Sequence, residues 1–155
     1  MSPRHLVLAS AILALPLQAA QATQAAQGAS PTDPILRVEA ATFRNARGDA
    51  GCLLFKASEG FPDQTDKAWR VLHVPIEQGR AVCEFKDVPA GTYAVVVLHD
   101  ENLNHKMDKN FLGIPQEGWG VSNNVRPALS APRFQDATFT VKPSAPATVS
   151  IQLGY

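Results

Sequence analysis

Apolar residues in this sequence fall into short runs separated by Gly, Pro, Asn and Asp, and no helical repeat extends over three turns. Short runs rich in β-branched and aromatic residues that alternate with polar ones predict β-strands. The run TYAVVVL at 92–98 is almost entirely apolar and predicts a central strand buried on both faces. The predicted strands cover residues 35–43, 52–57, 69–76, 81–85, 92–98, 137–141 and 148–153.

These elements, about seven short strands, predict an all-β fold, specifically an antiparallel β-sandwich. Pro75 lacks an amide N–H, so we expect the end of its strand at a sheet edge. Residues 62–68 are expected to hold one helical turn. Nearly forty residues between Leu98 and Ala137 show no regular pattern. An insertion of that length in a compact domain is usually functional or held by something specific, so we expect a long ordered loop insertion.

The N-terminal segment has the pattern of a secretory signal peptide. Arg4 precedes an apolar run of twelve residues at 6–17, and small residues follow at Ala20 and Ala22. Twelve residues interrupted by Pro16 are too few to cross ~30 Å of hydrocarbon as a helix. The predicted organisation is a signal peptide at 1–22, with cleavage between about 19 and 26, a flexible polar leader at 23–34 and one folded domain at 35–155.

Export to the periplasm or the medium permits a disulfide bond, because these compartments are oxidising. Cys52 and Cys83 are the only cysteines, and each lies in an apolar-rich segment that is predicted to be a strand. A bond between them would close a loop of 31 residues and add ~3 to 4 kcal/mol in the chain-entropy model. Two buried thiols are the alternative. We predict the bond, between strands that are adjacent or face each other across the sandwich.

Composition narrows the class of partner. The 14 basic and 14 acidic side chains give a net charge of zero, without the basic excess of a nucleic-acid-binding protein. Apolar residues make up 45% of the chain, too many for a disordered protein. We therefore expect no nucleic-acid partner and no transmembrane segment after signal cleavage. The expected partner is an unidentified small molecule, glycan or protein.

The insertion opens with alternating Asp and Asn side chains. An EF-hand-type loop uses oxygen ligands at its first, third, fifth and ninth positions to bind Ca²⁺. Two positions depart from that pattern, because His105 replaces the usual sixth Gly and Phe111 replaces the usual twelfth Glu. Histidine tolerates positive φ better than most residues. The candidate Ca²⁺ ligands are Asp100, Asn102, Asn104 and Asp108.

Two interpretations of this loop stay open. Glu101 or Glu117 could supply the missing carboxylate of a calcium site. Alternatively, Asp and Asn side chains could form Asx-turns with their own backbone and hold the loop without an ion. Lys106 and Lys109 lie beside the site, and their charge would oppose a cation.

The second half of the insertion predicts a ligand surface. Residues 113–120 contain three glycines and a proline, typical of a rigid turn, together with Trp119. An exposed indole could stack on a sugar or a peptide, whereas the alternative is a lid over one end of the sandwich. The predicted surface consists of His99, Glu117, Trp119, Ser122 and Asn123.

Candidate catalytic residues are sparse. His73 lies in an apolar strand pattern and is expected in the core. The histidines of the predicted exported chain also lack the close spacing of a zinc site. We therefore expect a non-enzymatic module whose loop at 99–124 is a binding or calcium-stabilised surface. The alternative is a hydrolase-like enzyme that uses His99 and Asp100, to which Ser122 could be added, although no strained nucleophile turn is visible.

The run PAGTYAVVVLHDENLN at 89–104 is distinctive, and the GIP triplet at 113–115 and the pair Ser122-Asn123 follow it. With these motifs the chain resembles the DUF2141 family of exported bacterial proteins, whose function is unknown. The resemblance implies a secreted or periplasmic β-sandwich similar to transthyretin-like and carboxypeptidase-regulatory-like modules. It implies no catalytic residue.

Overall fold

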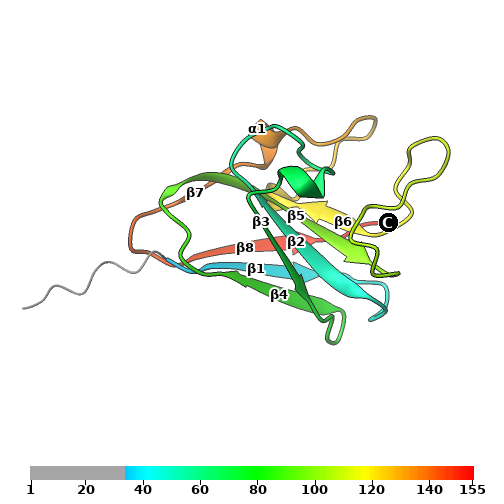
Figure 1. The fold of residues 1–155 in the computed structure, drawn as a ribbon, viewed down its shortest axis with the longest axis horizontal. Helices are drawn as coiled ribbons and strands as arrows, with labels where there is room; N and C mark the ends of the chain where they lie inside the picture. The colour runs from blue at the N-terminus through cyan, green and yellow to red at the C-terminus, as the bar shows by residue number, and fades with distance from the viewer. Residues whose placement is uncertain (1–33) are drawn as a thin grey trace, which may run out of the picture.

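The structure, a computed structural model, describes residues 34–155, which form two packed β-sheets (Figure 1). The predicted signal peptide, and the predicted leader apart from Pro34, lie outside the described residues. Pro34 is buried and its carbonyl accepts the N–H of Val88 at 3.2 Å, so it belongs to the domain. The elements are β1 (Leu36–Ala41), β2 (Asp49–Phe55), η1 (Thr65–Lys67), β3 (Arg70–Val74), β4 (Arg80–Phe85), β5 (Gly91–Asp100), β6 (Trp119–Val121), η2 (Ser122–Asn124), α1 (Phe134–Ala137), β7 (Phe139–Val141) and β8 (Ala147–Gln152).

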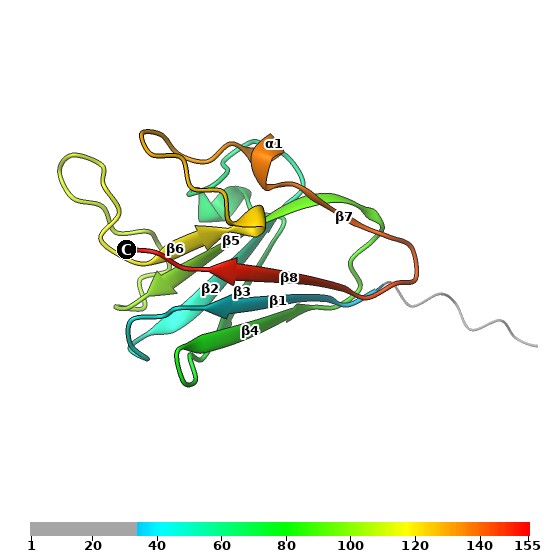
Figure 2. The same cartoon turned by 180° about the vertical axis from the view of Figure 1, so that it is seen from behind.

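The smaller sheet has the strand order β4-β1-β8, and the larger sheet has the order β3-β2-β5-β6, with β7 paired to the start of β5. The predicted β-sandwich is confirmed, with eight strands in the described residues. One detail of the prediction was wrong, because β1 and β8 run parallel, with Leu36 opposite Ala147. The chain leaves β7 at the end of the sandwich where β1 begins, so β8 runs in the direction of β1 (Figure 2). As expected, the strand before Pro75 ends at Val74 and lies at a sheet edge.

The main core lies between the two sheets. Strands β1 and β4 bury every second residue, as an element with one face on the core must. Cys52 of β2 and Cys83 of β4 are joined by a disulfide bond with a Cα–Cα distance of 6.5 Å. The predicted bond is therefore present, and it links the two sheets across the core.

Strand β5 is buried on both faces from Tyr93 to Asp100, as predicted. Tyr93, Val95 and Val97 face the main core. Ala94 and Val96 point to the other face, where they join a second apolar cluster covered by residues such as Phe61 and Phe134. The outer face of the larger sheet is thus partly covered by the segments around η1 and α1, and the exposed part of that face carries the site described below.

Strand β6 was not predicted, because three residues with a central glycine carry no alternating pattern. A Cβ at Gly120 would lie 2.7 Å from the carbonyl oxygen of Gln152, so only glycine allows β6 to approach β8 this closely. Trp119 and Gly154 exchange two backbone hydrogen bonds of 3.0 Å, which connect the larger sheet to the segment after β8. Residues 34–155 contain no helix long and apolar enough to cross a bilayer.

Candidate functional site

Asp100 ends β5 and fixes the loop that follows. Its carboxylate is fully buried and accepts the N–H of Asn104 at 3.1 Å and the N–H of His105 at 2.6 Å. Leu103 and His105 both have a φ of 60°, so His105 adopts the left-handed conformation expected at the sixth loop position. The chain therefore reverses direction around a single buried carboxylate.

Three of the four predicted calcium ligands meet in this loop. The side-chain amides of Asn102 and Asn104 donate to the carboxylate of Asp108 at 2.7 and 2.9 Å. Their own oxygens accept backbone N–H groups, from Asn104 at 3.1 Å and from Lys106 at 2.8 Å. These contacts are the Asx-turn chemistry of the alternative interpretation. For an ion to lie between these side chains, both amides would have to turn over so that oxygen faces Asp108.

Glu117, at the other end of the loop, binds the loop backbone at two points. Its two carboxylate oxygens accept the N–H of Glu101 at 2.9 Å and the N–H of Asp108 at 3.1 Å. Only 5% of Glu117 is exposed, so this predicted ligand-surface residue lies in the interior of the loop. Asp100 and Glu117 together bind four backbone N–H groups, so two carboxylates hold the backbone of the loop at four points.

The first loop residue, Glu101, is held by the turn after β1. Arg44 Nε donates to its carboxylate at 2.6 Å, and Asn45 Nδ2 donates to it at 3.3 Å. Burial raises the pKa of Glu101, but these hydrogen bonds and the charge of Arg44 lower it by more, so the pKa lies below its ordinary value. The carboxylate therefore stays ionised in this arrangement.

The residues of the hydrolase alternative do not come together. His99 is fully buried, with Nδ1 2.7 Å from the Tyr155 hydroxyl and Nε2 2.9 Å from the Arg47 carbonyl oxygen. Ser122 Oγ donates to the carbonyl of Ala137 at 2.5 Å and accepts a backbone N–H from β5. Because the Asp100 carboxylate binds the loop backbone, the three groups form no nucleophile–base–acid chain.

Of the five predicted ligand-surface residues, Trp119 lines a pocket, whereas His99, Glu117 and Ser122 are buried. Asn123 is exposed, but its amide donates to the carbonyls of Asp136 and Thr138 at 3.1 and 2.9 Å, so it ties η2 to α1. The indole of Trp119 is half-buried and Arg126 stacks on it, with 5.0 Å between the guanidinium carbon and the ring centroid. Trp119 lies in β6, a strand of the larger sheet, rather than in a separate lid over one end of the sandwich.

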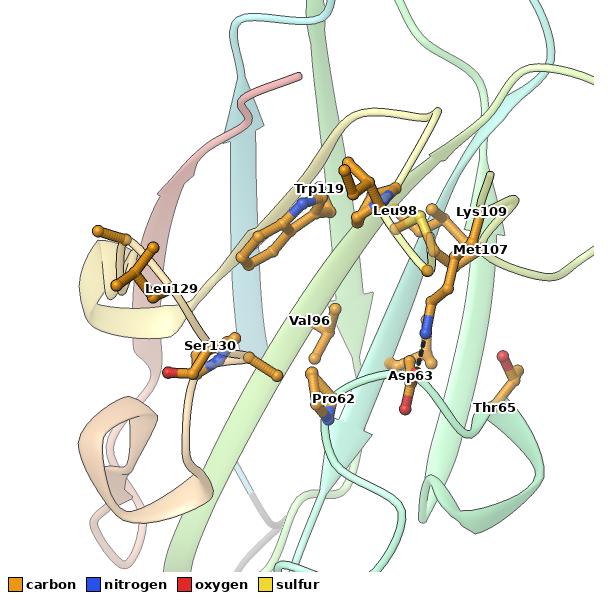
Figure 3. Close-up of a pocket in the computed structure, with 17 residues that line it drawn as sticks. Pro62, Asp63, Thr65, Val96, Leu98, Met107, Lys109, Trp119, Leu129 and Ser130 are labelled. Carbon is orange, nitrogen blue, oxygen red and sulfur yellow. Dashed lines mark hydrogen bonds and ion pairs between the residues drawn. The ribbon is translucent and has the colours of Figure 1, made fainter. Parts of the chain in front are cut away.

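The pocket lies on the outer face of the larger sheet and has a volume of about 380 Å³ (Figure 3). Its floor is apolar and consists of Leu53 of β2 with Val96 and Leu98 of β5. The loop after β5 supplies a wall with Met107 and residues 113–115, and residues 128–132 form another wall. A volume of this size and a mainly apolar lining are typical of small-molecule sites.

Polar groups lie at one side of the pocket. Lys109 forms an ion pair with Asp63, drawn as a dashed line in Figure 3, and Thr65 lies beside it. This ion pair joins the segment before η1 to the loop after β5 at that side of the pocket. An apolar floor with a charged pair at the rim suits a ligand that has an apolar body and one polar end.

The sequence did not indicate this pocket. Its lining comes from five separate segments, of which only the loop around residues 99–124 was assigned to a site. The alternation of β5 could have placed Val96 and Leu98 on one face of the strand, but nothing in the sequence indicates that this face is partly open. The expectation for His73 was wrong, because this residue is exposed on the edge strand β3.

Comparison with known proteins identifies a family for this chain but no function. Residues 38–149 match the family described as "Uncharacterized protein conserved in bacteria (DUF2141)". The chain belongs to the DUF2141 family. The match covers all strands of this DUF2141 domain except the ends of β1 and β8. No curated protein and no solved structure matches the chain.

Proposed function

We propose that this DUF2141 protein is an exported, non-enzymatic binding module whose ligand is a small amphipathic molecule. The observation that carries the proposal is the pocket of about 380 Å³ between the outer face of the larger sheet and the loop after β5. The pocket is walled by a loop that two buried carboxylates hold in place. A loop fixed on a rigid sheet is the usual way in which a β-sandwich presents a binding surface.

The lining defines the chemical class of the ligand. Leu53, Val96 and Leu98 would cover an aliphatic or aromatic body, and the indole of Trp119 offers a flat surface for stacking. Lys109 and Asp63 would engage a polar or charged end, at the cost of their own ion pair. This combination favours a small molecule over an extended glycan, which needs hydrogen-bonding groups along its whole length.

Export is part of the proposal and rests on two features. The first is the signal-peptide pattern at the N-terminus. The second is the disulfide bond between Cys52 and Cys83, because such bonds persist in oxidising compartments and are rare in the cytosol.

The proposal is tested by screening fragments against the isotope-labelled protein by NMR. The chain contains two tryptophans, so two indole N–H signals are expected. Trp119 lines the pocket, whereas Trp69 packs against Tyr93 and the Lys56 ammonium, away from the pocket lining. Ligands of the proposed class should shift the Trp119 signal and leave the Trp69 signal in place. A library of amphipathic aromatic and aliphatic fragments that shifts neither signal would contradict the proposal.

A second candidate function is Ca²⁺ binding by the loop at 100–108. It is supported by the approach of the Asn102 and Asn104 side chains to the Asp108 carboxylate, because turning both amides over would direct three oxygen-bearing side chains to one point. Glu117 lies close enough to bind the backbone of Asp108 and would serve as a further carboxylate. Lys109 is turned away to its ion pair with Asp63, which removes one of the two charges expected to oppose a cation. Bound calcium would rigidify the wall of the pocket.

A further inference from the structure

We propose that Asp49, His73 and His105 form a binding site for a transition-metal dication of the Zn²⁺ or Cu²⁺ class. One potential ligand atom from each of these residues lies within 4.8 Å of the other two. The imidazole rings of His73 and His105 are stacked, with centroids 4.1 Å apart and an angle of 27° between their planes. The site therefore unites two histidines that are far apart in the sequence.

The larger sheet positions two of the three ligands. His73 lies opposite Gly51 in the pairing of β3 with β2, and its ring lies over that glycine, where a Cβ would be 3.4 Å from Cε1. Asp49 begins β2 on the same outer face. Its two carboxylate oxygens are each 3.1 Å from Nδ1 of His73. The carboxylate and the imidazole are thus already oriented toward each other.

The loop after β5 supplies the third ligand. The backbone N–H of His105 donates to the buried Asp100 carboxylate at 2.6 Å, and its carbonyl accepts the Thr65 hydroxyl at 3.5 Å. The left-handed conformation at His105, with a φ of 60°, sends the side chain back toward β3. Since hydrogen bonds hold both the N–H and the carbonyl of His105, the backbone of the loop fixes where the imidazole lies.

The donor set decides the class of metal. Two imidazole nitrogens and one carboxylate oxygen suit Zn²⁺ and Cu²⁺, whereas Ca²⁺ and Mg²⁺ prefer oxygen ligands alone. Ligand atoms on opposite sides of such an ion are separated by at most about twice the bond length, ~4.2 Å. Both histidines are exposed, so small side-chain rotations can close the present spacing, and water can occupy the remaining positions. The site shares no ligand with the proposed calcium loop or with the pocket lining.

The test is a titration of the tag-free, chelator-treated protein with Zn²⁺ and with Cu²⁺ by isothermal calorimetry. Wild type should bind one ion per chain, and excess Ca²⁺ should not compete. His73→Ala and His105→Ala should each weaken binding by at least about tenfold, whereas the neighbouring control Lys106→Ala should change it by less than about twofold. The Cu²⁺ complex should show the electron paramagnetic resonance signature of two imidazole nitrogens.

The variants should remain folded, because His73 and His105 are exposed, and the metal-free unfolding midpoint verifies this. If a variant lost its fold, the corresponding His→Gln substitution would replace it. Undiminished binding in the variant that lacks both histidines would overturn the proposal, because His99 and all carboxylates remain there. Absence of binding by wild type would overturn it equally.

Discussion

The Nδ1 atom of His99 lies 2.7 Å from the hydroxyl of Tyr155, although the two residues come from β5 and from the segment after β8. Nε2 of the same ring faces the carbonyl oxygen of Arg47 at 2.9 Å, so Nε2–H donates there and Nδ1 accepts the Tyr155 O–H. The Tyr155 oxygen accepts the N–H of Arg44 at 2.9 Å. This chain of hydrogen bonds joins the end of β5 to the two segments beside it.

Tyr155→Phe should lower the free energy of unfolding by ~1 to 3 kcal/mol, because Nδ1 of the fully buried His99 then has no donor. Urea unfolding followed by circular dichroism measures the change. The control is Thr140→Val, which removes a hydroxyl from an exposed residue and should change the free energy by less than ~0.5 kcal/mol. Equal effects of the two substitutions would show that the His99–Tyr155 contact does not stabilise the fold.

The same contact predicts a pH dependence. Burial raises the pKa of Tyr155 above its ordinary value of 10.0, and the hydrogen bond from Arg44 offsets only part of that rise. The folded state therefore favours the neutral phenol, and the stability that this adds is lost as the pH rises from the ordinary pKa through the raised one. Above about pH 10 the unfolding free energy should fall more steeply for wild type than for Tyr155→Phe. Parallel slopes would contradict this assignment.

The disulfide bond between the sheets should be a major source of stability. Replacing both Cys52 and Cys83 by Ala should lower the free energy of unfolding by ~3 to 4 kcal/mol, because the unfolded chain regains the freedom of a closed loop of 31 residues. Mass spectrometry of the unreduced protein should find no reactive thiol. Two alkylated cysteines in protein produced in an oxidising compartment and never reduced would refute the bond.

Calcium should raise the melting temperature if the loop at 100–108 binds it. Binding to the folded state alone adds ~2.7 kcal/mol when free Ca²⁺ is a hundredfold above the Kd. Asp108→Asn should abolish the response, because its carboxylate is the point on which Asn102 and Asn104 converge. Asp66→Asn, in the exposed η1 turn, should keep it. A melting temperature that ignores both calcium and chelator would leave the Asx-turns as the whole explanation of the loop.

The fold could be predicted from local patterns wherever a strand carries its own signal. The apolar run of β5 and the alternation of β1 and β4 report the burial that the structure shows. Strand β6 carries no such signal, since its pairing with β5 depends on the space that Gly120 leaves beside Gln152. The parallel pairing of β1 with β8 could not be predicted from the sequence either, because it depends on which end of the sandwich the chain reaches after β7.

The candidate site was less predictable than the fold. The Asp and Asn alternation indicated the Asx-turns as one of its two interpretations, but the roles of Glu117 and Asp100 as backbone acceptors follow from distances between segments. The approach of His73 to His105 was likewise invisible, since spacing in the sequence says nothing about contact between an edge strand and a loop. The pocket exists because other segments cover only part of one face of β5. Alternation along a strand predicts which residues share a face, but it does not predict which segments pack against that face.

The pocket is tested most directly by filling it. Val96 lies on the pocket floor, so Val96→Phe should occupy part of its volume of about 380 Å³. For the fragment that shifts the Trp119 signal most, calorimetry should show affinity at least about tenfold weaker in Val96→Phe than in wild type. The control is the same substitution at Val82, which is 38% exposed on the smaller sheet, and Val82→Phe should bind as wild type does. Unchanged affinity in a folded Val96→Phe protein would contradict the claim that this pocket is the binding site.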